Sequence, residues 1–266
     1  MIPGNPATTE SPHTLPTPPV PDPACIALFL DVDGTLLEFA AHPDDVLVEP
    51  SLPLLLMSLR QRLGGALAPV SGRPLAQIDR LLGLPPGGAA GLHGAEWRGV
   101  DGIVARDAHD AGVLSAITRE ATTQVASLPG VLVEGKPNAI ALHYRNVPSA
   151  ALAVDRLASA LAAQAGPAFS LQRGDHVVEL KPAGSDKGDA VARLMRDPPF
   201  RGRVPWVVGD DHTDEHAFAV ARSLGGAGVI VGARRPTVAS WALQDPAAVR
   251  DWLVELLAAI PGEGEA

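Results

Sequence analysis

The sequence predicts an α/β fold in which a smaller α/β unit is inserted into a parallel-sheet core. The first observation is that strand-like apolar runs alternate with helical patterns, which is typical of a parallel sheet. The second is that three runs, at residues 25–30, 66–70 and 204–208, each end in a polar turn. Such short, uniformly apolar runs indicate strands buried on both faces. We expect the polar residues that follow them to gather at one edge of the sheet, where such folds bind ligands.

The helices expected beside this sheet follow from apolar spacing and from signals at their ends. One leucine stripe runs up to Gly64-Gly65, which ends its helix. The stripe consists of Leu52, Leu55, Leu56, Leu59 and Leu63. A second stripe covers residues 75–82. The last helix has Asp245 as its N-cap and Pro246 in its first position, and both residues favour helix initiation there.

The middle of the chain has the pattern of paired strands. Residues 131–134 and 139–145 flank a turn at residues 135–138, as in a β-hairpin. Period-two alternation places apolar side chains on one face of these strands and polar side chains on the other. Further along, Glu179 and Lys181 also share a face. A sheet of this kind buries one face on helices and leaves the other for solvent or for a ligand.

These patterns divide the chain into an arm, a core and an insertion. Residues 1–23 hold eight prolines and show no apolar periodicity, which predicts a disordered arm. Residues 24–99 and 179–266 are expected to form the core. Residues 100–178 are expected to form the inserted α/β cap domain.

Composition limits the partners and the setting. The net charge of −9 disfavours nucleic acid or an anionic membrane as the main partner. A single cysteine allows no disulfide within the chain and suits a cytoplasmic protein. The sequence shows neither an apolar stretch long enough for a membrane span nor the pattern of a signal peptide. The oligomeric state is left open.

Asp31 and Asp33 are the first candidate catalytic residues. They follow the run at residues 25–30 and continue into Gly34-Thr35. Carboxylates at the end of a buried strand suit Mg²⁺, and one of them can attack phosphorus as in aspartyl-phosphate enzymes. Taken alone, the pair fits a solvated turn as well, since Asp and Gly are common turn formers.

Three further residues favour the catalytic interpretation, because they follow other strands or begin a helix. They are Ser71, Lys187 and Asp210. Asp31 is then the expected nucleophile, and Asp33 is expected to protonate the leaving oxygen and afterwards to activate water. Ser71 would offer its hydroxyl and amide to the phosphate, and Lys187 a cation in the first turn of a helix.

Mg²⁺ is the expected cofactor. Its expected ligands are the carboxylates of Asp31 and Asp210 and the backbone carbonyl of Asp33. Supporting roles are expected for Thr35, Arg73, Asp211 and Asp214. Asp211 and Asp214 also suit the start of a helix, where acids are favoured by the helix dipole.

Other classes of function fit the sequence less well. His212-Thr-Asp-Glu-His216 matches the H-x-x-E-H pattern of some zinc peptidases, but it starts at a strand-to-helix turn rather than inside a helix. A receiver-type signalling module also carries a phosphoacceptor Asp, yet it needs about half this length and no insertion. A catalytically inactive regulatory copy is disfavoured because all the core residues are present.

The motifs together resemble the haloacid-dehalogenase (HAD) superfamily of phosphotransferases, in the order Asp31-Val-Asp-Gly-Thr35, Ser71, Lys187 and Gly209-Asp-Asp-x-x-Asp214. Within it, the chain is most similar to the trehalose-6-phosphate phosphatases. The narrower resemblance rests on Gly91-Leu-His-Gly-Ala-Glu96, on the stretch from Glu134-Gly-Lys136 to His143-Tyr-Arg145, and on Glu179-Leu-Lys-Pro182. It extends from about residue 25 to the C-terminus.

This resemblance implies a Rossmann-like core with a mobile cap. It also implies Mg²⁺-dependent hydrolysis of trehalose 6-phosphate through an aspartyl-phosphate, the last step of trehalose biosynthesis. Carried over by residue, the expected sugar-phosphate contacts are Lys136, Glu179, Arg145 and Glu134. His93 is expected to be a structural residue at the domain junction. Another sugar phosphate, such as sucrose phosphate, would leave the core motifs almost unchanged.

Overall fold

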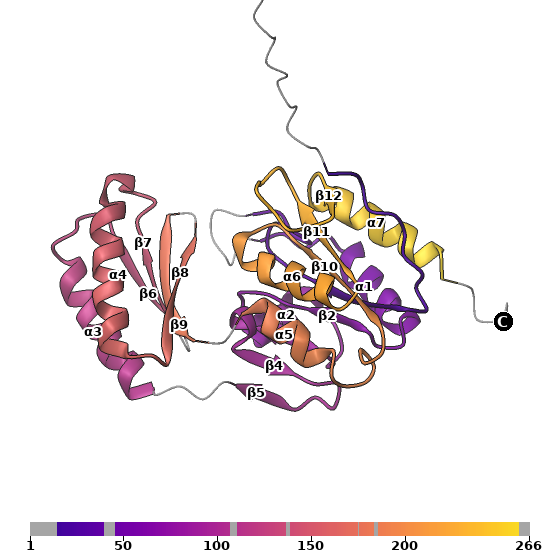
Figure 1. Ribbon diagram of the computed structural model, residues 1–266, viewed down its shortest axis with the longest axis horizontal. Helices are drawn as coiled ribbons and strands as arrows, with labels where there is room; N and C mark the ends of the chain where they lie inside the picture. The colour runs from indigo at the N-terminus through magenta and orange to yellow at the C-terminus, as the bar shows by residue number, and fades with distance from the viewer. Residues whose placement is uncertain are drawn as a thin grey trace, which may run out of the picture.

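The computed structural model describes residues 15–39, 46–106, 111–136, 139–174, 176–183 and 186–260. A core with a parallel sheet and a second unit with an antiparallel sheet lie next to each other in the chain's three-dimensional structure (Figure 1). Within these described ranges, no helix has the length and apolar character needed to cross a bilayer.

The core sheet has five parallel strands in the order β12-β11-β10-β1-β2. Their bounds are Ile26–Leu30 for β1, Leu67–Pro69 for β2, Val204–Gly209 for β10, Ala227–Val231 for β11 and Trp241–Leu243 for β12. The three strands expected from the sequence are therefore confirmed, and they are adjacent. Because β1 lies between β10 and β2, the polar residues after all three strands meet at one sheet edge.

Helices cover both faces of this sheet (Figure 1). They are α1 (Ser51–Arg62), α2 (Leu75–Leu82), α5 (Lys187–Leu194), α6 (Glu215–Ser223) and α7 (Pro246–Ala258). The α1 and α7 helices pack together, and α6 packs on α5, β10 and β11. The expected start of α7 is confirmed, because the Asp245 carboxylate accepts a hydrogen bond from the Ala248 amide at 2.9 Å.

A small antiparallel sheet joins the core beyond β2. It consists of β3 (Ala89–Gly91), β4 (Glu96–Arg98) and β5 (Val104–Arg106). A bridge between Val70 and Ala90 connects it to the end of β2. A single 3₁₀ turn, η2 (Leu92–Gly94), lies between β3 and β4 and carries His93.

The second unit has its own sheet and its own hydrophobic core. Its strands are β6 (Leu132–Gly135), β7 (Ile140–His143), β8 (Phe169–Gly174) and β9 (Val177–Pro182), in the order β6-β7-β9-β8. The expected hairpin is present, because β6 and β7 pair antiparallel. Helices α3 (Ala111–Val125) and α4 (Ala151–Ala165) cover the sheet face that points away from the core (Figure 1). A short 3₁₀ turn, η3 (Pro148–Ala150), precedes α4.

The strand pairing moves both expected boundaries of the insertion. The β5 strand pairs with β4, so residues up to 106 stay with the core sheet rather than leaving it at residue 100. The β9 strand pairs with β7 and β8, so the insertion continues to residue 182 rather than ending at 178. Polar and apolar residues continue to alternate from Glu179 to Lys181, as they do along a strand. This agrees with pairing that continues past Glu179.

Part of the arm expected to be disordered lies on the core. Residues 1–14 fall outside the described residues, but the Pro16 carbonyl accepts from the Ala242 amide at 3.0 Å. The Pro19 carbonyl accepts from the Trp252 indole N–H at 3.2 Å. Proline lacks an N–H but keeps its carbonyl acceptor, so a proline-rich segment can bind donors of the core along one side.

Candidate active site

The neighbouring strands β1 and β10 place Asp31 and Asp210 side by side. The Asp31 amide donates to the Val208 carbonyl at 2.9 Å, which fixes the first residue after β1 against the end of β10. Gly34 has a φ of +78°, and a Cβ there would lie 2.4 Å from Asp210 Oδ2. Glycine therefore lets the turn after β1 approach Asp210. From the same turn, the Thr35 hydroxyl donates to Asp210 Oδ1 at 3.1 Å.

Lys187 links two buried carboxylates at the centre of the site. Its Nζ lies 2.7 Å from Asp31 Oδ1 and 2.7 Å from Asp214 Oδ1. The side chains of all three residues are at most 6% exposed. Lys187 is the first residue of α5, as expected for the first turn of a helix. Asp214, expected only in a supporting role, is thus brought into direct contact with the central lysine.

The electrostatics of this cluster are dominated by burial. Burial raises the pKa of Asp31 well above its usual range, although Lys187 opposes the shift. Burial, with the Asp214 charge in addition, raises the pKa of Asp210 to about 6. For Lys187, burial lowers the pKa, but the Asp214 and Asp31 carboxylates outweigh it and hold the pKa above its ordinary value. The ammonium group is therefore retained among the acids.

The same cluster fits a divalent cation. Carboxylate oxygens of Asp31, Asp210 and Asp214 all lie within 4.8 Å of one another. If all three carboxylates are ionised, they and the Lys187 ammonium group have a net charge of −2. Burying such a charge is costly without a further cation. Oxygen-only donors are the set that Mg²⁺ prefers. The donor set of the site is thus compatible with the expected cofactor.

Asp33 is held by an arginine. Arg73 Nε lies 2.7 Å from Asp33 Oδ2, and Arg73 Nη2 lies 2.7 Å from Asp33 Oδ1. This is a bidentate pair, in which the planar guanidinium fixes the carboxylate's orientation. The Arg73 side chain is 9% exposed and the Asp33 side chain 28%. Arg73 thereby acts on the expected acid-base residue directly, which the sequence motif alone did not indicate.

Ser71 lies at the end of β2, as expected, but one of its predicted contacts is excluded. Its amide donates to the Ala90 carbonyl at 2.9 Å, so it is not available to a phosphate. The cause is the bridge that continues the β2 edge into β3. The buried Ser71 hydroxyl oxygen accepts from the Arg73 amide at 3.2 Å, and the hydroxyl can still donate.

The residues after Asp210 form a short helical turn, η4 (His212–Asp214). The Asp211 carboxylate accepts from the His212 amide at 2.6 Å, and Asp214 Oδ2 accepts from the Asp211 amide at 3.0 Å. Asp211 is thus a helix cap, the alternative that its position suggested. Asp214 combines a capping bond with its contact to Lys187.

The zinc interpretation of His212-x-x-Glu215-His216 finds no support in this geometry. Glu215 pairs with Arg234, and His216 Nδ1 lies 2.5 Å from Asp186 Oδ2. His212 Nδ1 contacts Arg234 as well, at 3.3 Å. Among the described residues, no group of possible metal ligands combines His212 with Glu215.

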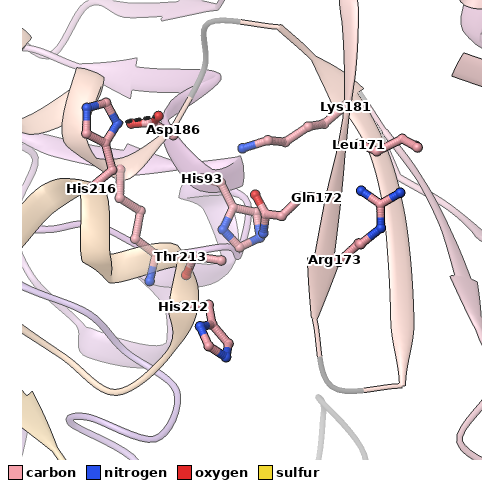
Figure 2. A pocket seen from close by; sticks show the side chains of 10 residues that line it. His93, Leu171, Gln172, Arg173, Lys181, Asp186, His212, Thr213 and His216 are labelled. Carbon is pink, nitrogen blue, oxygen red and sulfur yellow. Dashed lines mark hydrogen bonds and ion pairs between the residues drawn. The ribbon is translucent and has the colours of Figure 1, made fainter. Parts of the chain in front are cut away.

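A cavity of about 330 Å³ lies where β8 and β9 of the cap face the core (Figure 2). Its volume is within the usual range for small-molecule sites. Lys187 forms part of its wall, which connects the cavity to the acidic cluster. The lining residues are His93, Leu171, Gln172, Arg173, Lys181, Asp186, Lys187, His212, Thr213 and His216.

The four residues expected to contact the sugar phosphate do not lie together in the structure. Lys136 Nζ lies 3.3 Å from both carboxylate oxygens of Glu179, and this pair lies beside His93 of the core. Glu134 instead pairs with His143 at 2.8 Å on an exposed part of the sheet. Arg145 is exposed in the turn after β7, at the end of the hairpin opposite Lys136. Only Lys136 and Glu179 are therefore brought next to the core.

Several cavity residues were missed by the sequence-based selection. Lys181 and Gln172 share the polar sheet face with Glu179, because Gln172 is paired directly with Glu179. Period-two alternation had already placed Lys181 on the face of Glu179, although Lys181 was not selected as a site residue, and the same alternation could have identified Gln172. His93 lines the cavity rather than serving only the domain junction. Its Nδ1 is buried without a hydrogen-bond partner among the described residues, and burial together with nearby lysines holds its pKa well below the usual range.

Comparison with known proteins gives a consistent match. Residues 29–247 match the family model described as trehalose-phosphatase. A probable trehalose-phosphate phosphatase of Sinorhizobium fredii is 46% identical over 217 residues, covering 82% of this chain and 81% of the relative. The trehalose-6-phosphate phosphatase of Escherichia coli is 40% identical over 243 residues, covering 90% of this chain and 89% of the relative.

Solved structures confirm the fold class. The C-terminal domain of the C. albicans trehalose-6-phosphate phosphatase matches with a TM-score of 0.79 at 20% identity, covering 93% of this chain and all of that domain. Other structures with this fold include phosphatases of the HAD superfamily, as the motifs predicted.

Proposed function

The chain belongs to the trehalose-phosphatase family, and from that membership we propose that it hydrolyses trehalose 6-phosphate to trehalose and inorganic phosphate, the last step of trehalose biosynthesis. The observation that carries the proposal is the buried cluster of Asp31, Lys187, Asp210 and Asp214 beside a sugar-sized cavity. Asp31 is the proposed nucleophile because it belongs to this cluster and contacts Lys187, which also lines the cavity.

The reaction has two steps in this proposal. A carboxylate oxygen of Asp31 attacks phosphorus, the bond from phosphorus to the sugar oxygen breaks, and Asp33 gives its proton to the leaving oxygen. Water then attacks phosphorus of the aspartyl-phosphate, Asp33 takes the water's proton, and phosphate leaves with Asp31 restored. Arg73 donates one hydrogen bond to each Asp33 oxygen, and each oxygen keeps a further lone pair that can carry the transferred proton.

The other core residues have supporting roles in the proposal. Lys187 holds Asp31 in place through the 2.7 Å contact, and the Ser71 hydroxyl is the proposed donor to a phosphoryl oxygen. Mg²⁺ would be held by Asp31 and Asp210, with the Asp33 carbonyl as the expected third ligand. Its charge would reduce the repulsion between the nucleophile and the phosphate dianion. Thr35 orients Asp210 by its hydrogen bond.

The inserted unit is proposed to be a cap that selects the substrate. Lys136, Glu179 and Lys181 offer donors and acceptors to sugar hydroxyls from the face next to the core. Arg145 follows the end of β7 that is opposite Lys136. Glu134 is level with Glu179 in the sheet but lies two strands away and pairs with His143, so neither residue is given this role. Closure of such a cap would exclude bulk water from the reacting groups. We place this reaction in the cytoplasm, since the single Cys25 thiol is exposed and suits a reducing compartment.

Phosphate release from a panel of sugar phosphates tests this proposal. The panel contains trehalose 6-phosphate, sucrose phosphate and glucose 6-phosphate, each with Mg²⁺. We expect the highest kcat/KM for trehalose 6-phosphate. A clear preference for sucrose phosphate would keep the phosphatase chemistry but overturn the substrate assignment. No release from any of the three would overturn both.

A further inference from the structure

Arg234 lies in the connection between β11 and β12, outside every motif identified in the sequence. Its Nε donates to the Asp210 carbonyl at 3.0 Å, and its Nη2 donates to the Asp211 carbonyl at 3.1 Å. One planar guanidinium therefore binds two consecutive peptide groups of the loop that carries Asp210. Since the five donors of arginine have a fixed geometry, such contacts define the orientation of the bound carbonyls.

The guanidinium is itself held in place from the other side. Nη2 also pairs with Glu215, whose second carboxylate oxygen accepts from the Val238 amide at 2.8 Å. A further donor, Nη1, reaches the Pro236 carbonyl at 3.3 Å. The Arg234 side chain is only 19% exposed. Through these contacts, Arg234 links the β11–β12 connection to the loop that carries Asp210.

Arg234 also reaches one wall of the cavity. Its Nη1 lies 3.3 Å from Nδ1 of His212, a residue that lines the cavity beside Thr213 (Figure 2). Arginine has no acceptor, so in this contact the imidazole Nδ1 must accept. The ring hydrogen of the neutral imidazole is then on Nε2. The same side chain thus binds the loop of the acidic cluster and sets the tautomer of a cavity histidine.

We propose that Arg234 is a positioning residue of the active site, which fixes the backbone of the Asp210 loop so that the Asp210 carboxylate is oriented for Mg²⁺. Through His212 it also shapes the sugar-phosphate cavity. The inference rests on the proposed function, because that function assigns the cation to this cluster. Outer contacts that orient metal ligands typically contribute about 10- to 100-fold to metal affinity or activity.

The test uses Arg234→Lys and Arg234→Met in the full chain. Lysine keeps a charge but cannot bind two carbonyls and an imidazole in one plane. Arg235→Lys is the matched control, since Arg235 is adjacent and exposed and its only described hydrogen bond is to the Arg234 carbonyl. Mg²⁺ affinity is measured by calorimetry without substrate, and KM and kcat are measured for trehalose 6-phosphate at varied Mg²⁺.

We expect both Arg234 variants to bind Mg²⁺ about tenfold more weakly, with a raised KM and with kcat largely recovered at saturating Mg²⁺. The Arg235 control should match the wild type. Wild-type Mg²⁺ affinity in Arg234→Lys would overturn the proposal, whatever happens to KM. If both variants fail to fold, Arg234 is a folding residue and the positioning role is overturned as well. A wild type that ignores trehalose 6-phosphate refutes the proposed substrate, but the Mg²⁺ titration still decides the role of Arg234.

Discussion

Replacing Asp210 with asparagine should stabilise the Mg²⁺-free protein while it impairs the site. Burial and the Asp214 charge raise the pKa of Asp210 from its ordinary 3.8 to about 6. A shift of roughly two pKa units corresponds to ~3 kcal/mol. Since the folded-state pKa is raised, this stability is fully present below about pH 4 and is lost as pH rises through 6. Asp210→Asn removes the ionisation, so it avoids that loss.

The expected result at pH 7.5 in EDTA is a melting temperature above that of the wild type. With about 2–4 °C per kcal/mol for a chain of this size class, the gain is about 6–12 °C. The asparagine oxygen can still accept from Thr35, so that contact is not lost. Mg²⁺ at 100 times its Kd should raise the free energy of unfolding of the wild type by about 2.7 kcal/mol and that of the variant by less. The difference in stability between the two proteins should therefore become smaller when Mg²⁺ is added.

The difference in melting temperature is measured by thermal unfolding, followed by circular dichroism, at pH 4, 6 and 7.5, with and without Mg²⁺. The control is Asp211→Asn, because asparagine is an equally good helix cap and Asp211 does not contact Lys187. This control should change the melting temperature much less than Asp210→Asn does, because the Asp211 charge is the weakest of the causes that raise the pKa of Asp210. The reasoning is refuted if Asp210→Asn is less stable than the wild type at pH 7.5 in EDTA, or if the difference does not shrink towards pH 4.

Three further substitutions and one chelation experiment test other parts of the site. Lys187→Met leaves buried carboxylates without their cation and should lower the free energy of unfolding by about 3–5 kcal/mol at pH 8, as seen by urea titration. Lys136→Met, which breaks a more exposed pair, should cost at most about 1 kcal/mol, and equal losses would contradict the difference in burial. Arg73→Lys loses the fork on Asp33 and should lower kcat about tenfold or more, whereas an effect confined to KM would argue against that role. Chelation by EDTA should abolish phosphate release and Mg²⁺ should restore it; activity that persists after thorough chelation removes the metal from the mechanism.

The core of the site was predictable because the carboxyl ends of parallel strands all lie at the same edge of a sheet. Three apolar runs with polar ends were enough to predict that Asp31 and Asp210 lie at one edge of the sheet, and the structure adds that their strands, β1 and β10, are neighbours. The separate roles of Asp211 and Asp214 were not predictable. They are three residues apart in one helical turn, and only the tertiary position of Lys187 selects Asp214.

The cap was less predictable because alternation assigns a face but not a position along the strand. Lys136 and Arg145 satisfy the same face argument, yet the hairpin places them at opposite ends. The boundary set at residue 178 separated Glu179 from its own strand. Arg234 carried no signal at all, since it follows β11 in an irregular segment and acts through backbone carbonyls that any sequence provides.

The central claim is that Asp31 attacks the phosphoryl group. Asp33→Asn should permit attack more readily than hydrolysis, so it should trap the covalent intermediate. Rapid quenching after mixing this variant with ³²P-labelled trehalose 6-phosphate and Mg²⁺, followed by peptide mapping, measures it directly. The account predicts label on the peptide that contains Asp31, and none in the Asp31→Asn and Asp33→Asn double variant. Label on another peptide, or retained phosphate release by Asp31→Asn alone, would contradict it.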